Sequence, residues 1–253
     1  MDLGLKGRRA VVAGGSRGIG RAIAIGLASE GADVAICARS EEALRQTESE
    51  LAVHGGRVHA APCDMADPAA LARFLDGAHA ALGGVDIFVH NASALAFGAD
   101  LAAWESSIQV DLLAAVRACG QVLPWMAEAG GGSVLLVSSI SGIEASPTGD
   151  YAYSSVKAAL IAYAKKLSLD EAARGIRVNA LAPGSVEFPG GVWERAKQAR
   201  PELYAMVRAS IPFGRLGTAE EVADAAVYLV SDRARWVTGI CLAVDGGQHR
   251  GIR

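Results

Sequence analysis

The chain has 253 residues, of which 51% are hydrophobic and 20% are charged, and its formal net charge is −3. This composition excludes a disordered chain and a basic nucleic-acid-binding protein, because it supplies a large apolar core and no dense cationic patch. The sequence contains no run of 18 apolar residues, and residues 1–9 do not resemble a signal peptide. We therefore expect one domain over residues 1–253, located in the cytoplasm, with no nucleic-acid or membrane partner.

Short apolar runs alternate with longer amphipathic segments along the chain. The runs, which are predicted strands, cover 8–13, 33–38, 57–61, 85–90, 133–138, 176–182 and 239–244. The amphipathic segments, which are predicted helices, cover 18–30, 41–54, 67–82, 101–129, 151–174 and 218–230. Nearly continuous apolar strands are typical of a parallel sheet that is buried on both faces. The pattern predicts an α/β fold with a doubly wound, parallel, seven-stranded sheet and a ligand at the carboxyl ends of the strands.

A glycine-rich turn at residues 13–20 follows the first predicted strand and opens the first predicted helix. Glycines allow the backbone to turn tightly and to approach a pyrophosphate, which the helix N-terminus attracts. The residues expected to contact such a cofactor are Gly14, Ser16, Arg17, Gly18, Ile19 and Gly20. The alternative is a glycine-rich turn that binds no ligand.

The end of the second predicted strand carries a clue to the choice of cofactor. A carboxylate about 20 residues beyond the glycine turn binds the ribose hydroxyl of NAD, whereas a basic residue there accepts the phosphate of NADP. This sequence has Arg39, followed by Ser40, and Arg17 adds a second guanidinium in the turn itself. The two arginines favour NADP(H) over the alternative NAD(H). Alternatively, Arg39 is an ordinary solvated surface residue.

A tyrosine and a lysine stand four residues apart in the helix predicted at 151–174. Tyr153 and Lys157 therefore share one face of that helix, where an ammonium favours the phenolate form of tyrosine. Upstream, Ser139 follows the fifth predicted strand, where a hydroxyl can polarise a carbonyl in the ligand crevice. Taken singly, each feature is also explained by ordinary helix or turn chemistry.

The sequence resembles a known family in a set of motifs and in their order along the chain. These motifs are the glycine turn, Asp64, the stretch His90-Asn91-Ala92-Ser93, Ser139, the Tyr153/Lys157 pair and Pro183-Gly184. The family that they resemble is the short-chain dehydrogenase/reductase family. The resemblance implies a single-domain Rossmann fold that transfers hydride between NAD(P) and a carbonyl or alcohol. It also implies that Tyr153 is the general acid/base, that Lys157 assists it and holds the nicotinamide ribose, and that Ser139 orients the substrate oxygen. The further cofactor contacts that it implies are Asp64, Met65, Asn91, Ala92, Tyr153, Lys157, Pro183, Gly184 and Val186.

The sequence departs from the family pattern at several positions. Asp111 stands where the family has a catalytic asparagine, and an ionised carboxylate accepts hydrogen bonds without donating them. Phe188 replaces a hydroxyl residue that would contact the cofactor, and Ala13 and Ser93 replace a threonine and a glycine. These changes put the proton relay and the cofactor loop in question, while the Ser139, Tyr153 and Lys157 set is intact.

The leading hypothesis is an NADP(H)-preferring oxidoreductase that acts on a small-molecule carbonyl or alcohol, and the resemblance implies a homotetramer. The alternative is a nucleotide-binding sensor or scaffold of the same fold without chemistry. The long stretch 184–217 is predicted to be a substrate-loop insertion in which Phe188, Trp193 and Tyr204 either wall an apolar pocket or pack against the sheet. The widely spaced cysteines and histidines predict no metal site.

Overall fold

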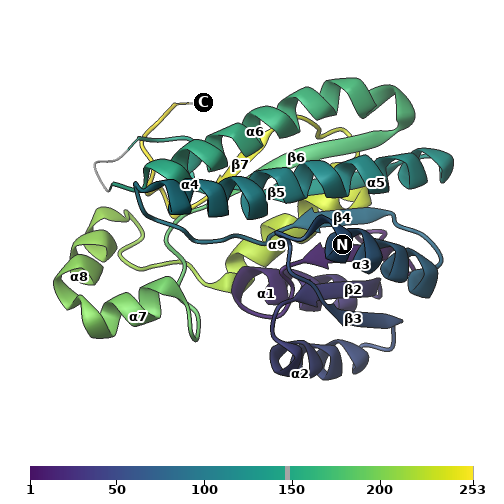
Figure 1. The fold of residues 1–253 in the computed structure, drawn as a ribbon, viewed down its shortest axis with the longest axis horizontal. Coiled ribbons are helices and arrows are strands. Elements are labelled where there is room, and N and C mark those ends of the chain that lie inside the picture. The colour runs from purple at the N-terminus through teal and green to yellow at the C-terminus, as the bar shows by residue number, and fades with distance from the viewer. Residues whose placement is uncertain (146–148, 253) are drawn as a thin grey trace.

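The computed structural model of the protein describes residues 1–145 and 149–252. Its centre is a seven-stranded sheet with the order β3-β2-β1-β4-β5-β6-β7, and each neighbouring pair of strands is parallel (Figure 1). The strands are β1 (Arg9–Ala13), β2 (Asp33–Ala38), β3 (Val58–Pro62), β4 (Ile87–His90), β5 (Gly132–Val137), β6 (Ile176–Pro183) and β7 (Cys241–Val244). The predicted doubly wound parallel sheet is confirmed, and the predicted strand ends lie within two residues of the observed ones.

Helices cover both faces of the sheet and enclose two separate cores. One face carries α1 (Gly18–Ser29), α2 (Glu41–Ala52) and α9 (Ala219–Val230), and the other carries α3 (Pro68–Leu82), α5 (Ala114–Glu128) and α6 (Tyr151–Glu171). Successive residues of β1 alternate between these cores, with Val11 in one and Val12 in the other. Both faces of each central strand are therefore buried, and this explains the continuous apolar runs of the sequence.

The helices begin where capping side chains predict. The Ser40 hydroxyl accepts a hydrogen bond from Ala43 N at the start of α2, and the Asp67 carboxylate accepts one from Ala69 N at the start of α3. At the start of α9, Thr218 and Glu221 each accept a hydrogen bond from the backbone N–H of the other, which forms a capping box. These local bonds position the strand-to-helix turns that carry the candidate site.

The predicted helix 101–129 is wrong as a continuous α-helix. It consists of α4 (Leu101–Ser107), a wider π-helical turn (Ile108–Leu113) and α5. In the wide turn, the N–H of Ala114 donates to the carbonyl of Gln109, five residues back. Such turns expose helical carbonyls to other partners, and they are frequent at functional sites.

The stretch 184–217 contains two helices that are not among the predicted ones, α7 (Val192–Ala199) and α8 (Pro201–Ser210). Figure 1 shows them in light green at the left, apart from the sheet and beyond the carboxyl ends of its strands. Short 3-10 turns cover Ile140–Gly142, Ala172–Arg174 and Asp232–Ala234. The sheet thus has an additional helical pair at the edge where a ligand is expected.

Across residues 1–145 and 149–252, no helix is both long enough and apolar enough to cross a bilayer. In the same part of the chain, no three histidine, cysteine, aspartate or glutamate side chains gather as metal ligands would. The four cysteines form no disulfide, and Cys37, Cys63 and Cys119 are buried.

Candidate active site and cofactor cleft

The residues singled out in the sequence lie along one edge of the sheet. The glycine turn follows β1, Arg39 follows β2, Asp64 follows β3 and Asn91 follows β4. Ser139 follows β5, and Pro183 ends β6. Because the strands are parallel, their carboxyl ends meet at this edge.

The glycine turn between β1 and α1 has no room for side chains at key positions. Gly14 and Gly18 have φ of 78° and 53°, a left-handed conformation that favours glycine. A Cβ on Gly20 would overlap the carbonyl oxygen of Gly14 and the side-chain amide of Asn91. The turn is fixed to β2 because Gly14 N and Gly15 N both donate to the Cys37 carbonyl, at 2.9 and 3.1 Å. The result is a bare backbone cradle at the N-terminus of α1.

Two arginines flank this cradle without protein partners. Arg17 and Arg39 are exposed, and neither side chain has a hydrogen-bond or ion-pair partner among the described residues. The Ser40 hydroxyl is used to cap α2, and the Ser16 carbonyl accepts a hydrogen bond from Thr47. The guanidiniums are therefore available for an anion outside the chain.

The remaining predicted cofactor contacts differ in how they are held. Asp64 is exposed and its carboxylate accepts a hydrogen bond from Ala66 N, whereas Met65 is buried beside Cys37. The Asn91 side chain donates to the Gly14 carbonyl at 3.0 Å, so it supports the glycine turn. The backbone of Ala92 packs directly against Gly14. Asn91 and Ala92 thus line the turn from the side of β4.

Lys157 and Asp111 form a buried ion pair. The Lys157 ammonium lies 3.0 Å from Asp111 Oδ1, and the two side chains are 3% and 1% exposed. The same ammonium donates to the Val137 carbonyl at 3.0 Å. The other carboxylate oxygen, Oδ2, accepts a hydrogen bond from Ala94 N at 2.9 Å. Burial by itself lowers the pKa of Lys157, but the Asp111 carboxylate and Tyr153 raise it, and the net direction is upward.

His90 supports Asp111 from the end of β4. Its Nε2 lies 3.2 Å from the Asp111 carbonyl oxygen, which belongs to the π-helical turn. Burial and the Lys157 charge lower the pKa of His90 to about 4, so the ring is neutral near pH 7. An acceptor at Nε2 requires the proton on that nitrogen, and Nδ1 is buried without a hydrogen-bond partner in the described chain.

Tyr153 lies beside the ion pair and against a second aromatic ring. Its ring centroid is 5.6 Å from the Lys157 ammonium and 4.8 Å from the centroid of Phe97. Ser139 is 8% exposed, and its hydroxyl accepts a hydrogen bond from Ser141 N. The turn that follows Ser139 approaches α6 so closely that a Cβ on Gly142 would meet the backbone of Lys157. The structure therefore brings Tyr153, Lys157 and Asp111 together, with Ser139 on the adjoining turn.

The segment after β6 is tied to the C-terminal residues and to the glycine turn. Gly184 N donates to the Val244 carbonyl, and Val186 is buried and pairs with Gly217. The Phe188 ring packs on Gly18, since a Cβ there would fall 2.5 Å from the ring. At the position where the family pattern has a hydroxyl, this chain therefore has an aromatic contact with the glycine turn.

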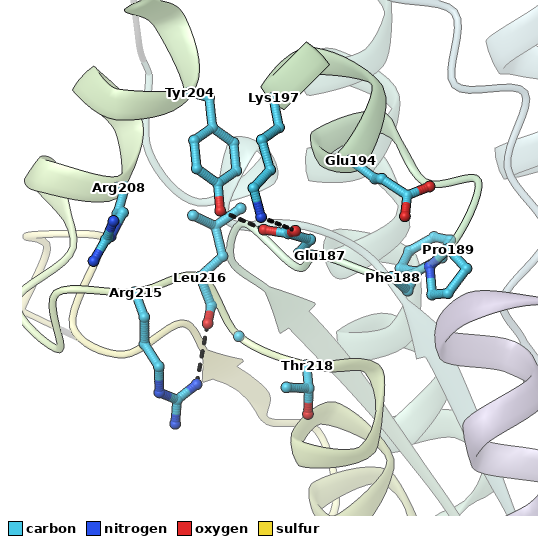
Figure 2. A pocket seen from close by; sticks show the side chains of 11 residues that line it. Glu187, Phe188, Pro189, Glu194, Lys197, Tyr204, Arg208, Arg215, Leu216 and Thr218 are labelled. Carbon is cyan, nitrogen blue, oxygen red and sulfur yellow. Dashed lines mark hydrogen bonds and ion pairs between the residues drawn. The ribbon is translucent and has the colours of Figure 1, made fainter. Parts of the chain in front are cut away.

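A cavity of about 530 Å³ separates α7 and α8 from the start of α9. Figure 2 shows Glu187 between Tyr204 and Lys197: the Tyr204 hydroxyl donates to one carboxylate oxygen, and Lys197 lies 2.9 Å from the other. Phe188 and Tyr204 line this cavity as proposed, but Trp193 does not, and the wall carries several charged groups. The expectation of an apolar pocket walled by all three aromatic residues is therefore wrong for this cavity.

A second cavity of about 260 Å³ lies between the loop after β4 and α7. It is lined by Leu95, Phe97, Val192, Arg195, Ala196, Ala199 and Arg200. Leu95 has φ of 51°, the only positive φ among the described non-glycine residues. No motif identifies Leu95, Phe97 or Glu187 as site residues, because their positions depend on this loop and on the two unpredicted helices.

Comparisons with known proteins support one family. A profile described as enoyl-(acyl carrier protein) reductase matches residues 13–249. The 3-oxoacyl-[acyl-carrier-protein] reductase FabG of Escherichia coli is 34% identical over 251 residues, 98% of this chain and 99% of that protein.

Solved structures with the same fold contain either nicotinamide cofactor. A 7α-hydroxysteroid dehydrogenase in complex with NADH and 7-oxo glycochenodeoxycholic acid has a TM-score of 0.90 at 30% identity, covering 97% of this chain and 96% of that one. L-sorbose reductase from Gluconobacter frateurii, in complex with NADPH and L-sorbose, has a TM-score of 0.87 at 31% identity and covers 100% of both chains. Similarity alone thus supports a nicotinamide cofactor without selecting between the two.

Proposed function

The chain belongs to the short-chain dehydrogenase/reductase family and is an NAD(P)-dependent oxidoreductase, and from this premise we propose that it is an NADP(H)-preferring enzyme that interconverts a carbonyl and a secondary alcohol. The observation that carries the proposal is the cluster of Tyr153, Lys157 and Asp111 beside the glycine cradle. A cluster of this composition provides a proton donor, a fixed positive charge and a charge that balances it.

The cradle fits a dinucleotide. The glycines at 14, 18 and 20 allow close packing of the turn against its neighbours, and no side chain of the described residues caps the N-terminus of α1, whose first backbone N–H groups can therefore bind a pyrophosphate. We expect the cofactor to be held there by Ser16, Ile19, Asn91 and Ala92, near its adenine by Asp64 and Met65, and near its nicotinamide by Pro183, Gly184 and Val186. The nicotinamide, when bound, supplies or accepts the hydride.

We assign proton transfer to the Tyr153 hydroxyl. In reduction it donates a proton to the carbonyl oxygen, and in oxidation it takes the proton from the alcohol. The Ser139 hydroxyl is assigned to hold the same oxygen by a hydrogen bond, which its position at the end of β5 supports. The Phe97 ring packs against the Tyr153 ring and restricts the orientations that the tyrosine can take.

Asp111 is assigned two positioning tasks, and both need a carboxylate. Its two oxygens face two donors, the Lys157 ammonium and the Ala94 backbone N–H. An asparagine has a single acceptor oxygen, so its NH₂ group would face one of these donors. In this chain aspartate therefore suits the position that the family pattern fills with asparagine, and the carboxylate holds both the lysine and the loop after β4.

The preference for NADP(H) rests on Arg17 and Arg39. Both guanidiniums are exposed beside the cradle without a partner in the described chain, and a phosphate is the anion that such a pair binds well. Neither side chain accepts hydrogen bonds, so the ribose hydroxyl of NAD(H) gains no acceptor from them.

The decisive experiment is NADPH consumption by the purified protein with a panel of ketones and aldehydes, together with fluorescence titration of NADPH and NADH. We expect turnover of at least one compound and tighter binding of NADPH. Cofactor binding without turnover of any carbonyl or alcohol would instead support the sensor or scaffold hypothesis.

Three broader assignments belong to the same proposal. Residues 1–253 form one domain in which 184–217 is the substrate loop, the protein is cytoplasmic, and it assembles as a homotetramer. Exposed apolar side chains around the contact between Gly239 and Ser168, namely Leu169, Trp236 and Ile240, support an assembly surface. Size-exclusion chromatography with light scattering tests the tetramer.

A further inference from the structure

The cavity of about 260 Å³ adjoins the proposed proton donor. Phe97 forms part of its wall and also lies 4.8 Å, centroid to centroid, from the Tyr153 ring. Leu95 forms another part of the wall, and the adjacent Ala94 N–H is held by Asp111. One side of the cavity is thus built by the same loop that the Asp111 carboxylate fixes, so its shape is coupled to the Lys157 site.

Five of the seven residues that line this cavity are apolar. Apart from two arginines, every lining residue is aliphatic or aromatic. A cavity of about 150 Å³ holds a benzene molecule, so this volume suits a substrate body of roughly ten non-hydrogen atoms. An apolar body of that size gains affinity from burial, but it is not oriented by burial alone.

Arg195 and Arg200 supply the only charge in the lining. Both are exposed, and neither side chain has a hydrogen-bond or ion-pair partner among the described residues. No carboxylate lines the cavity to neutralise them. Guanidiniums bind carboxylate, sulfonate and phosphate groups through paired hydrogen bonds, whereas they offer nothing to a neutral hydrocarbon end.

The larger cavity lacks this combination. Its Lys197 is paired with Glu187, its Arg215 is paired with Glu221, and its Arg208 donates to the Gly214 carbonyl. The cations there already have partners on the protein. The two cavities therefore differ in what they leave for a ligand, and of the two only the smaller one combines mostly apolar lining residues with unpaired guanidiniums.

We propose that the smaller cavity holds the body of the substrate and that this substrate carries an anionic group bound by Arg195 and Arg200. This inference rests on the proposed function, because it places the carbonyl at Tyr153 and the anion at the far side of the cavity. The substrate class is then an apolar keto acid, or a carbonyl compound whose carrier bears the negative charge.

Matched acids and esters test the inference. Levulinate and its longer-chain homologues, each with a methyl ketone at one end and a carboxylate at the other, are compared with their methyl esters at saturating NADPH. For the chain length that spans the cavity, we expect kcat/KM to be at least about tenfold higher for the acid, mainly through KM. The Arg195→Gln/Arg200→Gln double variant is expected to remove that ratio, and the corresponding pair of lysine substitutions to retain part of it.

Arg235→Gln is the matched control, because Arg235 is also exposed without a side-chain partner in the described chain but lies outside both cavities. It is expected to leave the acid-to-ester ratio unchanged. A wild-type ratio near one at every chain length, or an equal loss for acid and ester in the double variant, would overturn the inference.

A thioester arm distinguishes the two sources of charge. The acetoacetyl thioester of coenzyme A carries phosphates, whereas that of N-acetylcysteamine is neutral. Preference for the coenzyme A thioester, lost in the double variant, assigns the anion to a carrier. Preference for the keto acids, lost in the same variant, assigns it to the substrate itself.

Calorimetric titration of each acid and ester into the protein separates failure of this inference from failure of the proposed function. Acid-selective binding that depends on the two arginines, without turnover of any compound, would reject the catalytic role and leave the binding site supported. Turnover with no acid selectivity in either assay would reject the binding site alone.

Discussion

Two clusters, each with a lysine, a carboxylate and a tyrosine, lie in different parts of the molecule. Lys157, Asp111 and Tyr153 form one at the sheet edge, and Lys197 of α7, Tyr204 of α8 and Glu187 of the segment after β6 form the other. The ammonium-to-carboxylate distances are nearly equal, 3.0 and 2.9 Å. The ammonium-to-ring distances are also close, 5.6 and 5.3 Å.

The two clusters differ in their exposure to solvent. The side chains of Lys157 and Asp111 are 3% and 1% exposed, whereas those of Lys197 and Glu187 are 55% and 28% exposed. A buried ion pair cannot exchange its partner for solvent, so removing one member leaves an uncompensated charge. An exposed pair is screened and contributes little. Although the distances are similar, we therefore expect unequal effects when the corresponding residues of the two clusters are substituted.

The largest difference is expected for the two tyrosines. Tyr153→Phe removes the proposed proton donor and should lower kcat by about 10²- to 10⁴-fold, the usual contribution of general acid–base catalysis. Tyr204→Phe removes a hydroxyl that donates to Glu187, away from the proposed proton donor, and should change kcat by less than about threefold, because general acid–base effects need contact with the reacting group. Steady-state assays, with NADPH titration to verify cofactor binding, measure both. Equal losses in the two variants would contradict the assignment of Tyr153.

The next largest difference is expected for the two carboxylates. Asp111→Asn leaves one side-chain acceptor at position 111 for the Lys157 ammonium and the Ala94 N–H and removes the charge that balances Lys157, so it should lower the free energy of unfolding by about 3–5 kcal/mol. Glu187→Gln, the same chemical change in the exposed cluster, should leave the denaturation midpoint within the scatter of replicates. Chemical denaturation followed by tryptophan fluorescence compares the two. Similar midpoints for both variants would show that burial does not separate the clusters.

Within the described part of the chain, only the buried cluster has a histidine beside it, His90, and this residue makes the stability of the folded protein depend on pH. The pKa of this histidine is about 4 in the folded protein, and about 6.5 is usual for an unfolded chain. Between these values the unfolded state binds more protons, so stability is present above pH 6.5 and is lost as the pH falls toward 4. At pH 5 the loss is about 2 kcal/mol relative to pH 7.5. His90→Gln keeps an N–H donor but does not titrate, so the variant should lose about 2 kcal/mol less of its free energy of unfolding between pH 7.5 and pH 5. Chemical denaturation at a series of pH values measures this difference. Identical pH profiles for the variant and the wild type would contradict the assignment of this pH dependence to His90.

The smallest effect is expected where a cation has no partner at all. Arg39→Gln breaks no ion pair in the described chain, so stability should hold while the NADPH-to-NADH affinity ratio falls about tenfold, the equivalent of one charged hydrogen bond. Fluorescence titration of both cofactors gives the ratio. An unchanged ratio would remove Arg39 from the proposed phosphate site.

Much of the fold could be predicted from the sequence because its signals are local. Apolar runs predicted the strands, and Ser40, Asp67 and Thr218 predicted the starts of three helices. In the structure these three side chains accept capping hydrogen bonds at those helix starts. Helices α7 and α8 were missed because they are short, with 8 and 10 residues, and because Ala196 is the only residue in the two helices that is buried.

The candidate site was less predictable because its contacts join distant segments. Counting along the chain located Asp111, but its two donors come from α6 and from the loop after β4. The break at 108–113 left no trace in the helical pattern, since a π-helical turn and an α-helix accept the same residue types. The left-handed conformation of Leu95 is likewise imposed by its surroundings, as a leucine does not favour it.

The carboxylate between Lys157 and Ala94 also constrains how this sequence can diverge. An exchange of one nucleotide converts an aspartate codon into an asparagine codon, yet here that step places two donors opposite a single acceptor. We expect asparagine to be tolerated at position 111 only when other substitutions have already given the Ala94 N–H a different acceptor. Position 111 and residues 92–95 are therefore expected to be epistatic, and the order of their substitutions decides which lineages remain functional.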